Sequence, residues 1–83
     1  SYPSSELSIK LLNSEISIGK LLVENNVFKS MGEMRRMSSQ GALYINGERV
    51  TEITNNFNDS HLIQGKIMII KKGSKEFFIL KFS

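Results

Sequence analysis

Apolar positions recur with a helical period in the first half of the chain and with a strand-like period in the second half. In EISIGKLLVENN, the apolar residues from Ile18 to Leu22 follow the spacing of one helical face, and the preceding Ser17 is a preferred N-cap residue. Asn25 tolerates the left-handed backbone that closes a helix. The pattern predicts a first helix over residues 18–25.

A second helix is predicted within KSMGEMRRMSSQG. Ser30 and Glu33 have the S-x-x-E spacing of a capping box, in which two side chains satisfy free amides of the first turn. Gly41 stands where a glycine commonly ends a helix. We therefore expect a helix over residues 31–40.

The two faces of this second helix differ in chemistry. Met34 and Met37 lie three residues apart and are expected to face the core, which places Arg35 and Arg36 on the opposite side. A guanidinium group is always charged and donates a planar pair of hydrogen bonds that fits phosphate. The arginines therefore predict either a phosphate-binding surface or an ordinary solvated face that pairs with nearby acids.

Two hairpins are predicted after the second helix. LYINGERV places Asn46-Gly47, the pair that favours a type I′ turn, between two short β-prone runs. KIMIIKKG and KEFFILKF read as two further strands joined near Gly73-Ser74. The order helix, helix, hairpin, loop, hairpin predicts an α+β domain with two helices on a small, mostly antiparallel sheet of four to five strands.

The remaining segments have weaker patterns. Residues 51–60 are polar and predict a loop, followed by one helical turn over residues 61–64. Alternation over residues 7–11 favours a short strand or an extended arm. We expect residues 1–14 to be an N-terminal linker or arm, cut from a larger protein, and residues 15–83 to be the domain.

Composition narrows the class of protein. The 83 residues include no cysteine, so the core must hold by packing alone, as in reducing compartments. No apolar run approaches the roughly 20 residues that span a bilayer. The net charge is +3, and its positive excess falls in residues 29–50 and 66–83. These segments predict a basic face of the kind that binds nucleic acid if they converge, or scattered surface lysines if they do not.

Few residues suit catalysis or metal binding. The sole histidine, His61, has no obvious partner and is expected to be structural or exposed. Glycine-rich phosphate loops and metal-ligand spacings are missing from the sequence, so we expect neither an active site nor a metal or cofactor in this chain. Tyr44 could stack on a base, but a half-buried surface tyrosine fits its position better. Phe77, Phe78 and Phe82 are expected mostly in the core.

The segment KSMGEMRRMSSQGALYINGERV resembles the alpha-L RNA-binding motif, a module first known from a small-subunit ribosomal protein. Its serine cap, glutamate, arginine pair and glycine turn are matched at the family spacing, as are the Asn-Gly pair and the closing valine of its V-x-x-N-G-x-x-V hairpin. The matching positions are Ser30, Glu33, Arg35, Arg36, Gly41, Asn46, Gly47 and Val50.

The flanking sequences are similar to one branch of this family. ISIGKLLVENNVFKS and the closing GKIMIIKKGSKEFFILKF resemble the C-terminal tRNA-binding domain of bacterial-type tyrosyl-tRNA synthetases. The resemblance implies an alpha-L RNA-binding fold that docks tRNA(Tyr), while an upstream domain activates tyrosine and joins the parent ligase as a homodimer. It implies a cytoplasmic location, or the mitochondrial matrix as an alternative. The RNA-binding residues that it implies are Lys29, Arg35, Arg36, Arg49, Lys71, Lys72 and Lys75.

Departures from the family pattern imply a weak RNA face. Met31 and Ser39 stand where relatives often carry a basic residue, and Ser74 interrupts a Gly-Lys-Lys run. Met34 replaces a small alanine. The alternatives are a stand-alone ribosome-associated or heat-shock RNA-binding protein, and a protein-docking domain, which burial of the arginines and Lys72 against acids would favour.

Overall fold

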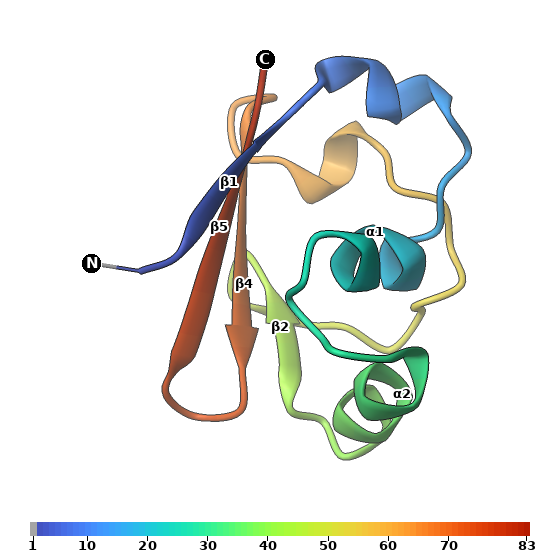
Figure 1. Cartoon of the computed structure of the whole chain (residues 1–83), viewed down its shortest axis with the longest axis vertical. Helices are drawn as coiled ribbons and strands as arrows, with labels where there is room; N and C mark the ends of the chain where they lie inside the picture. The colour runs from blue at the N-terminus through green and yellow to red at the C-terminus, as the bar shows by residue number, and fades with distance from the viewer. Residues whose placement is uncertain (1) are drawn as a thin grey trace.

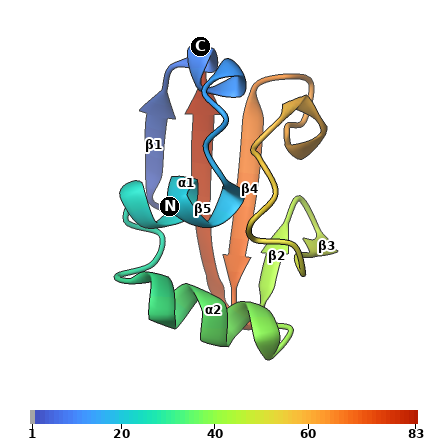
Figure 2. The ribbon, with the colours of Figure 1, turned by 90° about the vertical axis from the view of Figure 1, so that its right-hand side faces the viewer.

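A computed structural model of the chain describes residues 2–83 and places two helices on one side of a five-stranded sheet (Figure 1). The sheet order is β1-β5-β4-β2-β3, and in Figure 2 the helices lie in front of it. The predicted α+β class is confirmed. The strands are β1 (Ser4–Leu7), β2 (Leu43–Ile45), β3 (Glu48–Arg49), β4 (Ile67–Lys72) and β5 (Glu76–Phe82), and the helices are α1 (Ile18–Glu24) and α2 (Met31–Ser39), with 3-10 helices at Ile9–Asn13 and Asp59–His61.

Both α-helices begin at the predicted serine caps. The Ser17 hydroxyl accepts a hydrogen bond from the Lys20 N–H at 3.1 Å, and the Ser30 hydroxyl accepts one from the Glu33 N–H at 3.1 Å. The return bond of the predicted capping box differs, because the Glu33 carboxylate accepts from the Lys29 N–H at 3.1 Å rather than from that of Ser30. The glutamate thus fixes the residue before the cap.

Helix α2 ends in a closed turn at the predicted glycine. Gly41 has a φ of +73°, its N–H donates to the Ser38 carbonyl at 3.0 Å, and the Ala42 N–H donates to the Met37 carbonyl at 2.8 Å. These two bonds form a Schellman motif, which satisfies carbonyls left free at the helix end. The chain then enters β2 directly.

The β2–β3 hairpin has the predicted turn and an additional anchor. Asn46 and Gly47 have φ values of 51° and 86°, as a type I′ turn requires. The Asn46 side chain donates to the His61 carbonyl at 2.8 Å and accepts from the Ile69 N–H at 2.8 Å. The turn is therefore tied both to β4 and to the second 3-10 helix.

The N-terminal segment differs from the prediction at residues 9–11. Strand β1 pairs in parallel with β5, from Ser4 opposite Ile79 to Leu7 opposite Phe82, so the sheet includes one parallel pair. The strand predicted over residues 7–11 is wrong beyond Leu7, because the observed strand lies earlier, at Ser4–Leu7, and a 3-10 helix begins at Ile9. Ser8 begins that helix, since its hydroxyl accepts from the Lys10 N–H at 3.1 Å.

The helical turn predicted over residues 61–64 is also wrong in position. The turn lies at Asp59–His61, where the Asn58 side chain accepts from the Ser60 N–H at 2.8 Å and the His61 Nδ1 accepts from the Asn58 N–H at 3.0 Å. Gln64 cannot continue the helix because its φ is 52°. Polar caps before the turn, rather than the apolar residues after it, set its position.

The core lies between the helices and the covered face of the sheet. Met34 is fully buried there, and Met37 is partly buried at the edge, as expected for the inner face of α2. Phe78 packs against this core, whereas its neighbour Phe77 points to the other face and meets Tyr2 with 5.1 Å between ring centroids. The buried residues are Ile18, Leu21, Leu22, Val27, Phe28, Met34, Leu43, Ile45, Phe57, Met68, Ile70, Leu80 and Phe82.

Within residues 2–83, neither α-helix approaches the length and apolar character needed to cross a membrane.

Candidate nucleic-acid interface

Arg35 and Arg36 project from the solvent side of α2. Both are exposed, and within residues 2–83 neither guanidinium forms an ion pair with a carboxylate. The Arg36 guanidinium lies back along the helix beside Gly32, where a Cβ would stand 3.8 Å from Nη1. Because the serine cap and the closed turn fix both ends of α2, the two charges are held on a defined surface and remain free for a ligand.

Lys29 lies directly before the cap of α2 with its side chain exposed. Its backbone N–H is the main cause that lowers the pKa of Glu33 below the ordinary value, and the charges of Lys72, Lys29 and Arg36 lower this pKa further against an opposing effect of burial. Glu33 is therefore ionised at neutral pH. Its carboxylate is directed to the backbone of Lys29 and leaves the arginines unpaired.

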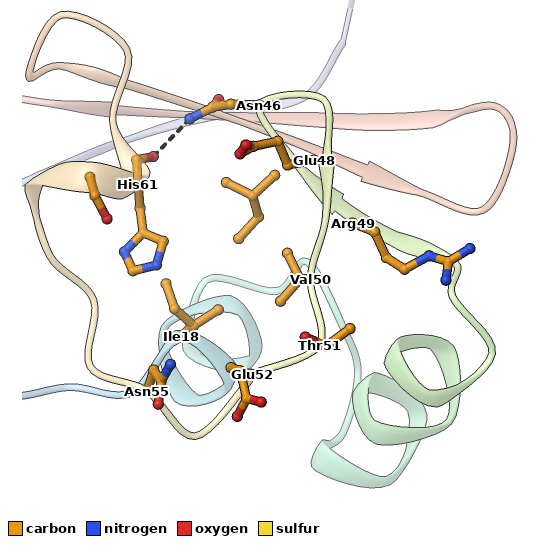
Figure 3. Close-up of a pocket in the computed structure, with 11 residues that line it drawn as sticks. Ile18, Asn46, Glu48, Arg49, Val50, Thr51, Glu52, Asn55 and His61 are labelled. Carbon is orange, nitrogen blue, oxygen red and sulfur yellow. Dashed lines mark hydrogen bonds between the residues drawn. The ribbon is translucent and has the colours of Figure 1, made fainter.

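Arg49 comes from β3 and reaches the C-terminal end of α2. In Figure 3 its side chain points away from the neighbouring pocket and towards the helix. The guanidinium packs beside Gly41, where a Cβ would lie 3.1 Å from Cζ. A cation is favourable at this end of a helix because the free carbonyls carry partial negative charge. The structure thus brings Arg49 to the same end of the molecule as α2.

Lys72 occupies a different environment from the other predicted contacts. Its ammonium donates to the Val27 carbonyl at 2.9 Å and lies 3.7 Å from the Glu33 carboxylate. The same ammonium stands 4.8 Å from the centre of the Phe28 ring and 5.7 Å from that of Phe78. Only 12% of the side chain is exposed. Lys72 therefore joins the α1–α2 connection to the sheet, and its charge does not face solvent.

Lys71 and Lys75 lie on either side of this partly buried lysine along the chain. Lys71 belongs to the face of the sheet without helices, where its ammonium stands 5.1 Å from the centre of the Tyr44 ring. Lys75 is exposed in the β4–β5 turn. The side chain of Met37 reaches that turn, since a Cβ on Gly73 would lie 3.8 Å from its Cε. The β4–β5 turn, which carries Lys75, and α2 are therefore at the same end of the molecule (Figure 1).

A pocket of about 400 Å³ opens between the β2–β3 hairpin and the segment that follows it (Figure 3). Glu48 and Glu52 line it, together with Asn55 and His61. Two carboxylates disfavour a phosphate here, and the His61 ring already binds the backbone of Asn58. Among residues 2–83, no group of three or more acidic or histidine side chains is placed to hold a metal ion.

Sequence reasoning missed two side chains that hold α2 and the hairpin in position. The buried Ser38 hydroxyl donates to the Val50 carbonyl at 3.1 Å, and Asn46 makes the two bonds described above. The Ser38 bond joins residues 12 positions apart, so local sequence holds no signal for it. A protein-docking domain is expected to bury Arg35, Arg36 and Lys72 against acidic residues. Only Lys72 is partly buried beside an acid, Glu33, because Arg35 and Arg36 are exposed.

Comparison with known proteins places this arrangement in a family. Residues 3–80 match the model of the tyrosine--tRNA ligase SYY-like C-terminal domain. The chain is 33% identical over 70 residues to the tyrosine--tRNA ligase of Streptococcus mutans, covering 84% of this chain and 17% of that protein. It is 32% identical over 80 residues to the enzyme of Streptococcus thermophilus, covering 96% of this chain and 18% of that protein.

A solved structure is similar in fold. The solution structure of a tyrosyl-tRNA synthetase C-terminal domain superposes with a TM-score of 0.71 at 23% identity, covering 98% of this chain and 78% of that one. The chain spans less than a fifth of the length of the curated ligases it matches.

Proposed function

Because the chain belongs to the family of tyrosine--tRNA ligase SYY-like C-terminal domains, we propose that it is the tRNA-docking domain of such a ligase. It binds the RNA mainly through phosphate and shape and leaves catalysis to another domain. The observation that carries this proposal is the pair of exposed, unpaired arginines on a helix that is fixed at both ends. A-form RNA offers phosphates and 2′-hydroxyls to such a surface more readily than base edges.

The proposed phosphate-binding surface consists of five cations, Lys29, Arg35, Arg36, Arg49 and Lys75, all of which are exposed. Lys71 supplements this surface from the uncovered face of the sheet. Lys72 is left out because its ammonium is engaged within the fold. With Met31 and Ser39 contributing no charge to α2, the surface is expected to bind more weakly than a richly basic one.

We propose tRNA(Tyr) as the ligand and a homodimeric ligase as the parent protein. The bacterial origin of the matched relatives favours the cytoplasm over the mitochondrial matrix. Within the ligase, the domain would hold the tRNA body while the acceptor end reaches the catalytic domain. Binding energy gained here would then lower KM for tRNA and leave tyrosine activation unchanged.

The test is the salt dependence of tRNA(Tyr) binding by the 83-residue chain and by its Arg35→Ala/Arg36→Ala variant. Each lost phosphate contact removes about one unit from the slope of log affinity against log salt, so the double variant should lose about two units. Its thermal unfolding should match that of the unsubstituted chain, because both arginines are exposed and unpaired.

A matched control is Lys20→Ala, which removes an exposed cation on α1 that pairs with Glu24. This variant should keep the full salt slope. An affinity that is independent of salt, or a double variant with unchanged binding, would contradict the proposal. Loss of folding in the double variant would instead make the arginines structural.

A further inference from the structure

The face of the sheet without helices carries a row of alternating cations and aromatic rings. Arg49 of β3 lies opposite Tyr44 of β2, Tyr44 lies opposite Lys71 of β4, and Lys71 lies opposite Phe77 of β5. Directly opposed residues of neighbouring strands point to the same face of a sheet. The row therefore crosses four strands on the side that Figure 1 shows free of helices.

The spacing of this row follows from sheet geometry. Neighbouring strands lie about 4.8 Å apart, so Tyr44 and Phe77 are separated by roughly 10 Å with Lys71 between them. The Lys71 ammonium stands 5.1 Å from the centre of the Tyr44 ring, and Tyr2 packs on Phe77 at 5.1 Å with a tilt of 52°. Tyr2 is 58% exposed, and the other members of the row remain partly open to solvent.

Charge in this row distinguishes nucleic acid from a protein partner. The centres of protein-docking surfaces are depleted in lysine, whereas here Lys71 lies between two aromatic residues in the middle of the row. Aromatic rings interleaved with cations are the chemistry that holds single-stranded nucleic acid, because bases stack on the rings and phosphates meet the charges. Arg49 also reaches Gly41 at the end of α2, which makes this face continuous with the phosphate-binding surface.

We propose that this row binds two adjacent unpaired nucleotides of RNA, with one base stacked on Tyr44, the next on Phe77, and the linking phosphate at Lys71. The inference rests on the proposed function for the identity of the ligand as RNA, but it uses a different face from α2. Tyr44 is half-buried as expected, and the proposal adds a base-stacking role to this position. The alpha-L motif covers the helix and hairpin, and the Lys71–Phe77 half of this row lies outside it.

The tyrosine content of the chain provides a direct readout. The chain has two tyrosines and no tryptophan, so Tyr2→Phe leaves Tyr44 as the only source of tyrosine emission. This variant is titrated with single-stranded tetrauridylate and with an abasic tetramer of the same phosphate count. We expect tetrauridylate to quench the emission and to bind more tightly than the abasic tetramer, which should bind without quenching.

Substitutions then locate the stacking. Fluorescence anisotropy of labelled tetrauridylate should show a loss of about 5- to 150-fold for Tyr44→Leu and for Phe77→Leu, the range measured when one stacked base loses its ring. Tyr44→Phe should retain binding, because it keeps the ring. Thermal unfolding of each variant confirms that the affinity is measured on folded protein.

A charge-matched pair of variants tests the phosphate contact. Lys71→Ala should weaken binding of both tetramers, while Lys81→Ala, which removes a cation from the same face but outside the row, should not. Equal effects of the two lysines would overturn the placement of the phosphate. Equal affinity for the two tetramers, or quenching that follows protein concentration without RNA, would overturn the proposal in favour of charge alone or of self-association.

The experiment distinguishes failure of this inference from failure of the proposed function. The Arg35→Ala/Arg36→Ala variant should keep the tetrauridylate preference, because α2 lies on the other side of the sheet (Figure 2). If tRNA binds but tetrauridylate does not, the stacking row is refuted and the docking proposal stands. If tetrauridylate binds but tRNA does not, the docking proposal is refuted and the stacking row stands.

Discussion

Replacement of Lys72 by methionine should destabilise the fold rather than weaken RNA binding. The change keeps the apolar stem between Phe28 and Phe78 and removes only the ammonium, which donates to the Val27 carbonyl at 2.9 Å. No backbone donor among residues 2–83 takes its place at this carbonyl. The variant therefore leaves a partly buried acceptor without a partner.

The magnitude follows from the contacts that are lost. A hydrogen bond from a charged donor contributes about 1.5–3 kcal/mol. Each of the two cation–π contacts adds about 0.5–1 kcal/mol. The ion pair with Glu33 is counted as zero because that carboxylate is partly exposed. These contributions overlap, so we expect a loss of about 2–4 kcal/mol, and a loss of 2 kcal/mol would lower Tm by about 8–16 °C.

Urea denaturation of Lys72→Met and of Lys71→Met provides the assay. Lys71 is the adjacent residue on the same strand and points to the uncovered face, so its substitution removes one partly exposed cation–π contact and should cost no more than about 1 kcal/mol. At temperatures where both variants are folded, Lys72→Met should keep the tRNA salt slope. Equal stability of the two variants would refute the structural role of Lys72, and a reduced slope would return it to the RNA-binding surface.

Three further substitutions test how the hairpin and α2 are held. Asn46→Gly keeps a residue that accepts positive φ but removes the side-chain hydrogen bonds to His61 and Ile69. Urea denaturation should therefore show a loss of about 1–3 kcal/mol in the free energy of unfolding. An unchanged free energy of unfolding would mean that the turn alone holds the hairpin. Glu33 has a lowered pKa in the folded state, so its contribution is complete above its ordinary pKa of about 4.5 and is lost as the pH falls through the lowered value. The difference in free energy of unfolding between the unsubstituted chain and Glu33→Gln should therefore shrink below that pH. The deficit of about 0.5–2 kcal/mol in Ser30→Ala should persist there, because the serine cap carries no titrating group. Parallel plots of unfolding free energy against pH for all three proteins would contradict this account.

Sequence alone was sufficient for features whose interactions close within a few residues. The Ser17 and Ser30 caps, the Gly41 turn and the Asn46-Gly47 turn each depend on atoms no more than five positions apart, so the local sequence contains both partners. Residue type and spacing then determine the backbone conformation with little help from the rest of the fold. The order of the main elements followed from these signals.

Features that depend on distant partners were not predictable. Lys72 looked like its neighbour Lys71 in sequence, and only its position opposite Val27, 45 residues away, makes it structural. The Asn46 side chain also ties the hairpin to β4, and this role depends on the backbone N–H of Ile69, 23 residues away. Alternation over residues 7–11 misled because the hydroxyl of Ser8 starts a 3-10 helix. In each case tertiary contacts decide the role of a residue whose local pattern allows two.

The parallel pairing of β1 with β5 has a consequence for how the chain folds. β4 and β5 join through a short turn and are expected to pair early, whereas β1 pairs with residues about 75 positions away and is expected to dock last. Until it does, β5 presents an open edge with the apolar run Phe77-Phe78-Ile79-Leu80, which another chain could extend into an intermolecular sheet. By pairing with β5, the strand β1 covers this edge and protects the chain from aggregation. The time that β1 takes to dock therefore sets how long the open edge of β5 can pair with another chain.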